Sequence, residues 1–86
     1  MQVGVQFSGS VPASSTRKWF THSWPATWHV VWYCIPLSPI QDANAQLEWK
    51  IQVERQTVDK VKYYVEVKNL TGAVITFEAR YAILNL

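Results

Sequence analysis

Apolar and polar residues alternate through the second half of the chain. Leu47 to Glu54, Lys60 to Lys68 and Ile75 to Ile83 place apolar side chains at odd positions and mostly polar side chains at even positions. Period-two alternation is typical of a β-strand with one buried face and one solvated face. We therefore predict three antiparallel strands here, joined as a C-terminal meander.

Charges on the polar positions indicate how the first two of these strands pair. One register forms three oppositely charged pairs: Glu54 with Lys62, Lys50 with Glu66, and Glu48 with Lys68. Each such pair contributes about 0.2–1 kcal/mol. A shift by one residue would set apolar side chains opposite polar ones, so this register is favoured. It requires a tight connection around residues 57–59. The next turn, at 69–72, offers Asn69 and Gly72 for the positive-φ positions of a hairpin loop.

The first half of the chain has shorter patterns broken by proline and small polar residues. We predict strands over Val3–Phe7, Arg17–His22 and Thr27–Ile35, separated by a loop over Ser8–Thr16 and a turn over Ser23–Ala26, and followed by a loop over Leu37–Asn44. No long stretch has helical periodicity. Residues 1–86 therefore read as a single all-β domain, a small antiparallel β-sandwich or flattened barrel of about six strands.

The segment Thr27–Ile35 lacks a solvated face. One side presents Trp28, Val30, Trp32 and Cys34, and the other presents His29, Val31, Tyr33 and Ile35. A strand that is apolar on both sides is normally covered on both sides. In a two-layer sandwich the core covers one side only, so something else must cover the second.

Three covers for this second side are open: the two loops, a bound ligand, or another copy of the chain. Three or four exposed aromatic residues, each with about 150–250 Å² of surface, exceed the roughly 300–600 Å² patch that monomers tolerate. We favour self-association into a homo-oligomer, with an interface built from His29, Val31, Trp32 and Tyr33. The N-terminal strand could pair within its own sheet or be exchanged with a neighbouring copy.

Composition excludes several classes of partner. The chain has 86 residues, of which 49% are hydrophobic and 16% charged, and its net charge is +2. Its basic residues are scattered among acids, so we expect no nucleic-acid partner. Cys34 is the only cysteine, which rules out an internal disulfide. With no visible signal peptide and no run of about 20 apolar residues, we expect a soluble protein without a membrane span.

The sequence offers little that resembles an active site. His29 and Cys34 point to opposite faces of one predicted strand and His22 lies elsewhere, so we expect neither a metal nor a cofactor. The chain has no nucleophile elbow and no glycine-rich phosphate loop. The carboxylates lie near lysine or arginine on the solvated face, which is better explained by ion pairing than by acid–base chemistry. We expect a non-enzymatic protein, with Cys34 as a buried thiol of raised pKa.

The tryptophans suggest a ligand site. Trp24 precedes a proline in a predicted turn, where no periodic pattern requires its burial. Sugars present an apolar face that stacks on aromatic rings, so we predict a carbohydrate-binding, lectin-like site formed by Trp24, His22, Trp19 and Trp28. The alternative is that Trp24 is a lid on the core. The alternative function is a structural or assembly subunit with no small-molecule ligand.

Overall fold

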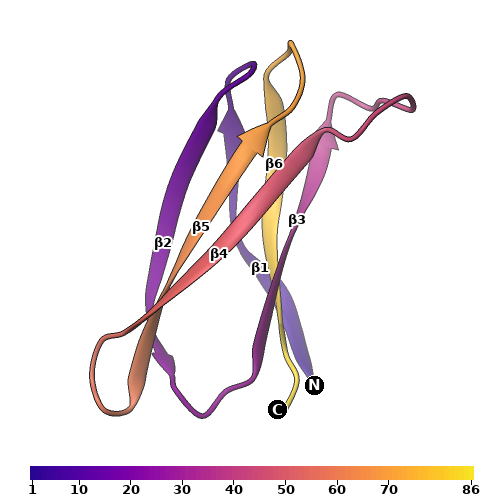
Figure 1. Cartoon of the computed structure of the whole chain (residues 1–86). Helices are drawn as coiled ribbons and strands as arrows, with labels where there is room; N and C mark the ends of the chain where they lie inside the picture. The colour runs from indigo at the N-terminus through magenta and orange to yellow at the C-terminus, as the bar shows by residue number, and fades with distance from the viewer.

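The chain folds into six β-strands with no helix. The computed structural model describes residues 1–86 and contains β1 Gln2–Val11, β2 Thr16–Pro25, β3 Val30–Ser38, β4 Leu47–Arg55, β5 Lys60–Asn69 and β6 Ile75–Ile83. Two three-stranded antiparallel sheets, in the orders β1-β6-β3 and β2-β5-β4, pack face to face (Figure 1). The predicted all-β sandwich of about six strands is confirmed.

The predicted pairing of β4 with β5 is also confirmed. Glu54 lies opposite Lys62 and Lys50 lies opposite Glu66. The connection between these strands closes at Lys60, whose carbonyl oxygen accepts the backbone N–H groups of Gln56 (3.0 Å) and Thr57 (3.2 Å). Charge pairing and the hydrophobic alternation therefore select the same register.

The predicted meander is wrong for its last strand. β6 does not pair with β5; it crosses to the other sheet and lies between β1 and β3. The free edge of β5 is taken by β2 instead, which places Trp19 opposite Val65 and Trp24 opposite Val61. The turn differs accordingly, because no glycine has a positive φ and Gly72 does not form a hairpin loop. Alternation identified the strands, but it carries no information about which sheet each one joins.

Two segments predicted as loop belong to strands. β1 continues through Ser8 to Val11 and pairs with β6 over these residues. Here Ser8 and Ser10 face solvent, whereas Gly9 and Val11 face the core. Gly9 leaves room for the core rings, since an added Cβ would lie 3.0 Å from Trp19 and 3.2 Å from Phe77. In residues 8–11 the solvated positions are both serine, so this part of the strand resembles a loop in sequence and was predicted as one. β3 is likewise shifted, beginning at Val30 and ending at Ser38.

β2 also runs further than predicted, through the expected turn to Pro25. Its pairing with β5 shifts between Thr21 and Trp24, and Ser23 adopts a φ of 66° within this β-bulge. The backbone N–H of Ser23 donates to Oε1 of Gln56 at 2.9 Å. Bulges re-aim the residues that follow them, and this one directs Trp24 into the core. Pro25 is tolerated because it ends an edge strand.

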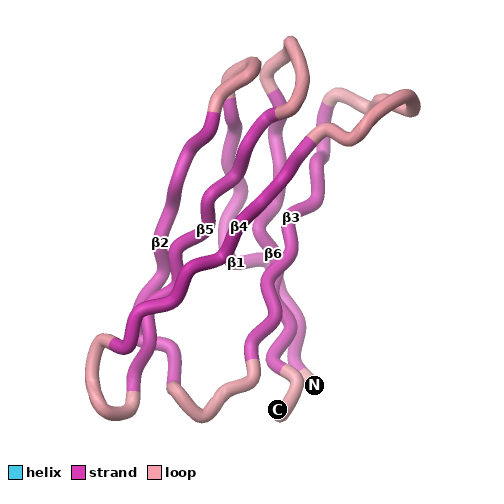
Figure 2. Tube along the Cα trace, viewed as in Figure 1, coloured by secondary structure: helices cyan, strands magenta, loops and turns pink.

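The core is narrow and largely aromatic. Its fully buried side chains include Val65, Val67, Phe77 and Ile83, and ring clusters fill the remainder: Phe7, Trp19 and Phe77 in one group, and Trp24, Trp32, Tyr63 and Tyr81 in the other. Loops lie at the two ends of the sandwich, and the chain termini lie together at one of them (Figure 2). Both outer sheet faces are therefore left free of loops.

Candidate interaction surfaces

Trp24 lies inside the protein rather than on a loop surface. It is buried, and its indole Nε1 donates to Oγ1 of Thr21 at 3.0 Å. Its ring packs edge-on against Trp32 and Tyr81, with centroid distances of 5.2 and 5.3 Å. The structure therefore places this ring as part of the core, the alternative weighed above.

The other three residues of the predicted ligand site do not gather around an exposed Trp24. Trp19 is half-buried between Phe7 and Phe77. Trp28 is half-buried against Trp24, at a centroid distance of 6.0 Å. His22 alone is exposed, with its Nδ1 2.9 Å from Oγ of Ser23. The four side chains form no joint exposed platform.

The predicted interface residues separate onto two sides of β3. Trp32 is buried in the core, and its Nε1 has no hydrogen-bond partner. Val31 and Tyr33 point to the outside of the β1-β6-β3 sheet, since they lie opposite Ala82 and Arg80 of β6. His29 is exposed in the β2–β3 loop, where its backbone N–H donates to Oδ1 of Asn85 at 2.9 Å. An interface on this sheet can use Val31 and Tyr33, but not Trp32.

The outside of the β1-β6-β3 sheet carries a group of exposed apolar side chains. We call it the valine face; its residues are Val3, Val5, Val31, Tyr33, Ile35 and Ala82, with Glu78 and Arg80 between them. Val3, Val5 and Val31 are 61%, 50% and 47% exposed. These exposures show that neither loop folds across the face, so of the three covers considered, the loops are excluded.

The sequence pattern placed Val3 and Val5 on the wrong side. They alternate with Phe7, and in a regular strand this spacing would put all three side chains on one face. A register shift between Val5 and Phe7 reverses the alternation, so Phe7 points inward and both valines point outward. A one-residue bulge moves every earlier side chain to the opposite face. No local sequence signal marks this bulge, and the valine face was therefore only partly visible from the sequence.

One ion pair lies within the valine face. Oε1 of Glu78 is 3.0 Å from Nε and 2.8 Å from Nη2 of Arg80. The two side chains are only 25% and 33% exposed. Each charge is thus already neutralised within one chain.

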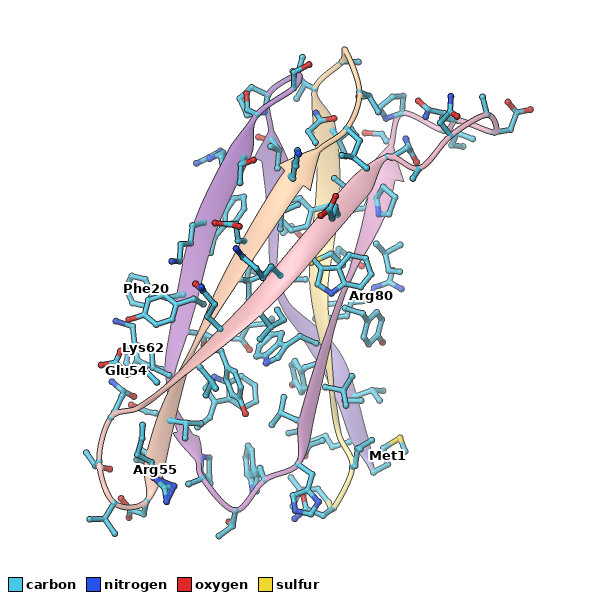
Figure 3. All side chains as sticks on the ribbon, viewed as in Figure 1. Met1, Phe20, Glu54, Arg55, Lys62 and Arg80 are labelled. Carbon is cyan, nitrogen blue, oxygen red and sulfur yellow. The ribbon has the colours of Figure 1, made fainter.

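The outside of the β2-β5-β4 sheet carries a different arrangement, which we call the lysine–aromatic ladder: Lys18, Tyr64, Lys62 and Phe20. The ammonium nitrogen of Lys62 lies 4.3 Å from the ring centre of Phe20 and 5.0 Å from that of Tyr64. Lys18 lies 4.9 Å from the Tyr64 ring. Phe20, Lys62 and Glu54 project together from this sheet, whereas Arg80 lies on the other side of the molecule (Figure 3). An apolar ring at an even position of β2 is the only sequence signal for this surface.

A shallow hollow of about 100 Å³ lies beside the ladder. Its lining is Thr16, Glu48, Trp49, Lys50, Glu66 and Lys68. Pockets that enclose a small molecule are typically about 300–1,000 Å³. The hollow is therefore too small to enclose a ligand. The side chain of Trp49, which is 40% exposed, lies on the other face of β4, because Trp49 is opposite the buried Val67.

The remaining chemical groups are placed as follows. Cys34 is buried, and this burial raises the pKa of its thiol to about 11, so the reactive thiolate is scarce at neutral pH. Burial also raises the pKa of Tyr63. No group of three or more His, Cys, Asp or Glu side chains is positioned to hold a metal ion. The chain has no helix of the length and hydrophobicity needed to cross a membrane.

Comparison of the chain with protein-family models, with curated proteins and with solved structures found no match. The two outer sheet faces are therefore the candidate sites of function.

Proposed function

We propose that this protein is a structural subunit that self-associates through the valine face. The main observation behind the proposal is that Val3, Val5 and Val31 are all exposed on the outer face of the three-stranded sheet β1-β6-β3. Contiguous exposed apolar surface of this kind typically marks a contact with another macromolecule. Covering it with a second sheet would bury these side chains in the way that sandwich layers bury their inner faces.

The charges on the valine face favour a second copy of the same chain as its cover. Glu78 and Arg80 neutralise each other, so the face carries no net charge to repel an identical face. In a two-fold contact the same patch meets itself, and Glu78 of one copy can approach Arg80 of the other. A partner of strongly acidic or basic character would find no complementary field here.

Solution mass tests this proposal. Light scattering over a range of concentrations is expected to give a dimer or higher oligomer for the wild type and a monomer for Val31→Lys, because a buried lysine without a partner opposes association. Val58→Lys is the matched control, since Val58 is almost fully exposed in the β4–β5 loop and lies away from the face. A wild-type protein that stays monomeric at every concentration would contradict the proposal.

A second candidate function, carbohydrate binding, is supported by Trp49 rather than by Trp24. The half-exposed indole of Trp49, on the edge strand β4, could stack on the apolar face of a sugar ring. Calorimetric titration with a panel of oligosaccharides tests this. Trp49→Ala is expected to abolish any binding, whereas Val53→Ala, an exposed position on the same strand, should leave it unchanged. Equal loss in both variants, or binding that survives Trp49→Ala, would refute it.

A further inference from the structure

Two aromatic rings stand side by side on the outside of the β2-β5-β4 sheet. Phe20 of β2 lies directly opposite Tyr64 of β5, which brings their side chains onto the same face. Phe20 is 59% exposed and has no polar atom, so no hydrogen bond accounts for its position on a solvated face. The ammonium group of Lys62 lies over the Phe20 ring, 4.3 Å from its centre.

The acidic residues around these rings are already engaged. Glu66 forms an ion pair with Lys50 at 3.3 Å, and Glu54 accepts a hydrogen bond from the Tyr64 hydroxyl group at 2.7 Å. Lys18 lies opposite Glu66 and Lys62 lies opposite Glu54, but neither lysine forms an ion pair; both lie over aromatic rings instead. β2 itself contains no acidic residue. Ion pairing therefore compensates Lys50 of β4 but not Lys18 of β2 or Lys62 of β5.

We propose that the lysine–aromatic ladder binds single-stranded nucleic acid. Proteins that bind single strands combine aromatic side chains, on which successive bases stack, with cationic side chains that contact the phosphates. Phe20 and Tyr64 would each receive one base. Lys18 and Lys62 would move from the rings to the phosphates, since long flexible side chains at an exposed site give up weak cation–π contacts readily.

The shape of the surface favours a single strand over a duplex. The ladder lies on the face of a sheet, and the chain has no helix that could enter a major groove. Bases are accessible for stacking only when they are unpaired. The site is on the sheet opposite the valine face, so the proposal does not depend on self-association.

Fluorescence anisotropy with a labelled thymidine 12-mer tests the proposal. Phe20→Leu keeps an apolar side chain but removes the ring, and it is expected to weaken binding roughly 5- to 150-fold, the range for loss of one stacked base. Phe20→Trp should retain binding. Because Phe20 is exposed, neither change should alter the thermal unfolding curve, which serves as the check on folding.

The salt dependence of the binding affinity tests whether Lys62 contacts a phosphate group. Lys62→Gln is expected to lower the slope of log affinity against log salt by about 0.7, the value for one phosphate contact on a single strand. Lys50→Gln is the matched control, because Lys50 lies on the same sheet but pairs with Glu66; it should leave the slope unchanged. An equal change in the two variants would overturn the assignment.

Competition identifies the class of ligand. An unlabelled single strand should displace the probe more effectively than a duplex of the same length or a sulfated oligosaccharide of the same charge. Three results would each overturn the proposal: no binding of the 12-mer at low salt, duplex or sulfated sugar competing equally, or affinity unaffected by Phe20→Leu. The monomeric Val31→Lys variant should bind the 12-mer normally, so failure of the assembly proposal would be distinguishable from failure of this one.

Discussion

Asn69, at the end of β5, donates its side-chain Nδ2 to the carbonyl oxygen of Val11, at the end of β1 in the opposite sheet, at 3.0 Å. The same nitrogen lies 3.2 Å from the carbonyl oxygen of Pro12 and 2.7 Å from that of Ala73. Its Oδ1 accepts from both the backbone N–H and the hydroxyl group of Thr71, each at 2.8 Å. At 1% exposure Asn69 is the buried polar residue of the domain. It joins the two sheets at the end opposite the chain termini.

Replacing Asn69 should destabilise the domain strongly. Asn69→Ala would remove the side-chain donor to the carbonyl oxygens of Val11 and Pro12 and one of the two donors to that of Ala73, and a buried group left unpaired costs about 1–3 kcal/mol. We expect the free energy of unfolding in urea to fall by at least about 2 kcal/mol. Asn44→Ala, in the exposed β3–β4 loop, is the control and should change it by less than about 0.5 kcal/mol. Similar values for the two variants would refute the role assigned to Asn69.

Two glycines should respond in opposite ways to the same substitution. In Gly9→Ala the added methyl group would lie 3.0 Å from Trp19 and 3.2 Å from Phe77, an overpacking that typically costs about 1–3 kcal/mol. In Gly72→Ala the methyl group meets nothing within 4 Å and φ is not positive, so stability should be unchanged or rise by up to about 1 kcal/mol. Thermal unfolding of both variants measures these two changes in stability. A Gly9→Ala variant as stable as the wild type would show that the sheets can separate to accept it.

The Cys34 thiol predicts how stability depends on alkaline pH. Its folded-state pKa of about 11 is above the ordinary value of the unfolded chain. As pH rises between these two values, the unfolded state loses the proton first, so unfolding becomes more favourable. The urea midpoint should fall over this window, and less steeply in Cys34→Ala. Burial of Tyr63 acts in the same direction and is common to both proteins, so the comparison isolates the thiol.

Under the assembly proposal, Glu78 and Arg80 should behave as a coupled pair. Arg80→Gln alone would leave the Glu78 carboxylate without its partner when the face is covered, and we expect association to weaken by about tenfold or more. Glu78→Gln should have a similar effect. The double variant should associate better than either single one, because it contains no unpaired charge. Additive losses would mean that the two residues act separately.

Regular alternation was enough to locate most strands and the β4–β5 register. It also assigned the inward residues of β6, such as Phe77 and Ala79, correctly. It failed where the period is interrupted. The bulge between Val5 and Phe7 and the one between Thr21 and Trp24 each reversed which side chains face the core. Consequently, Trp24, which was predicted at the surface, lies in the core, and Val5 points to the opposite face from Phe7 in spite of their period-two spacing.

By itself the sequence determined that the protein is all-β with about six strands, because period-two alternation, β-branched residues and the absence of helical periodicity are local properties of each segment. Only the tertiary structure decided that β6 joins β1 and β3, that Trp32 is core while Val31 is surface, and that Phe20 stands beside Tyr64. The physical reason is that a strand's own residues specify which of its faces is apolar. They do not specify which edge it pairs with or where a bulge shifts its register, since these depend on contacts between residues far apart in the chain.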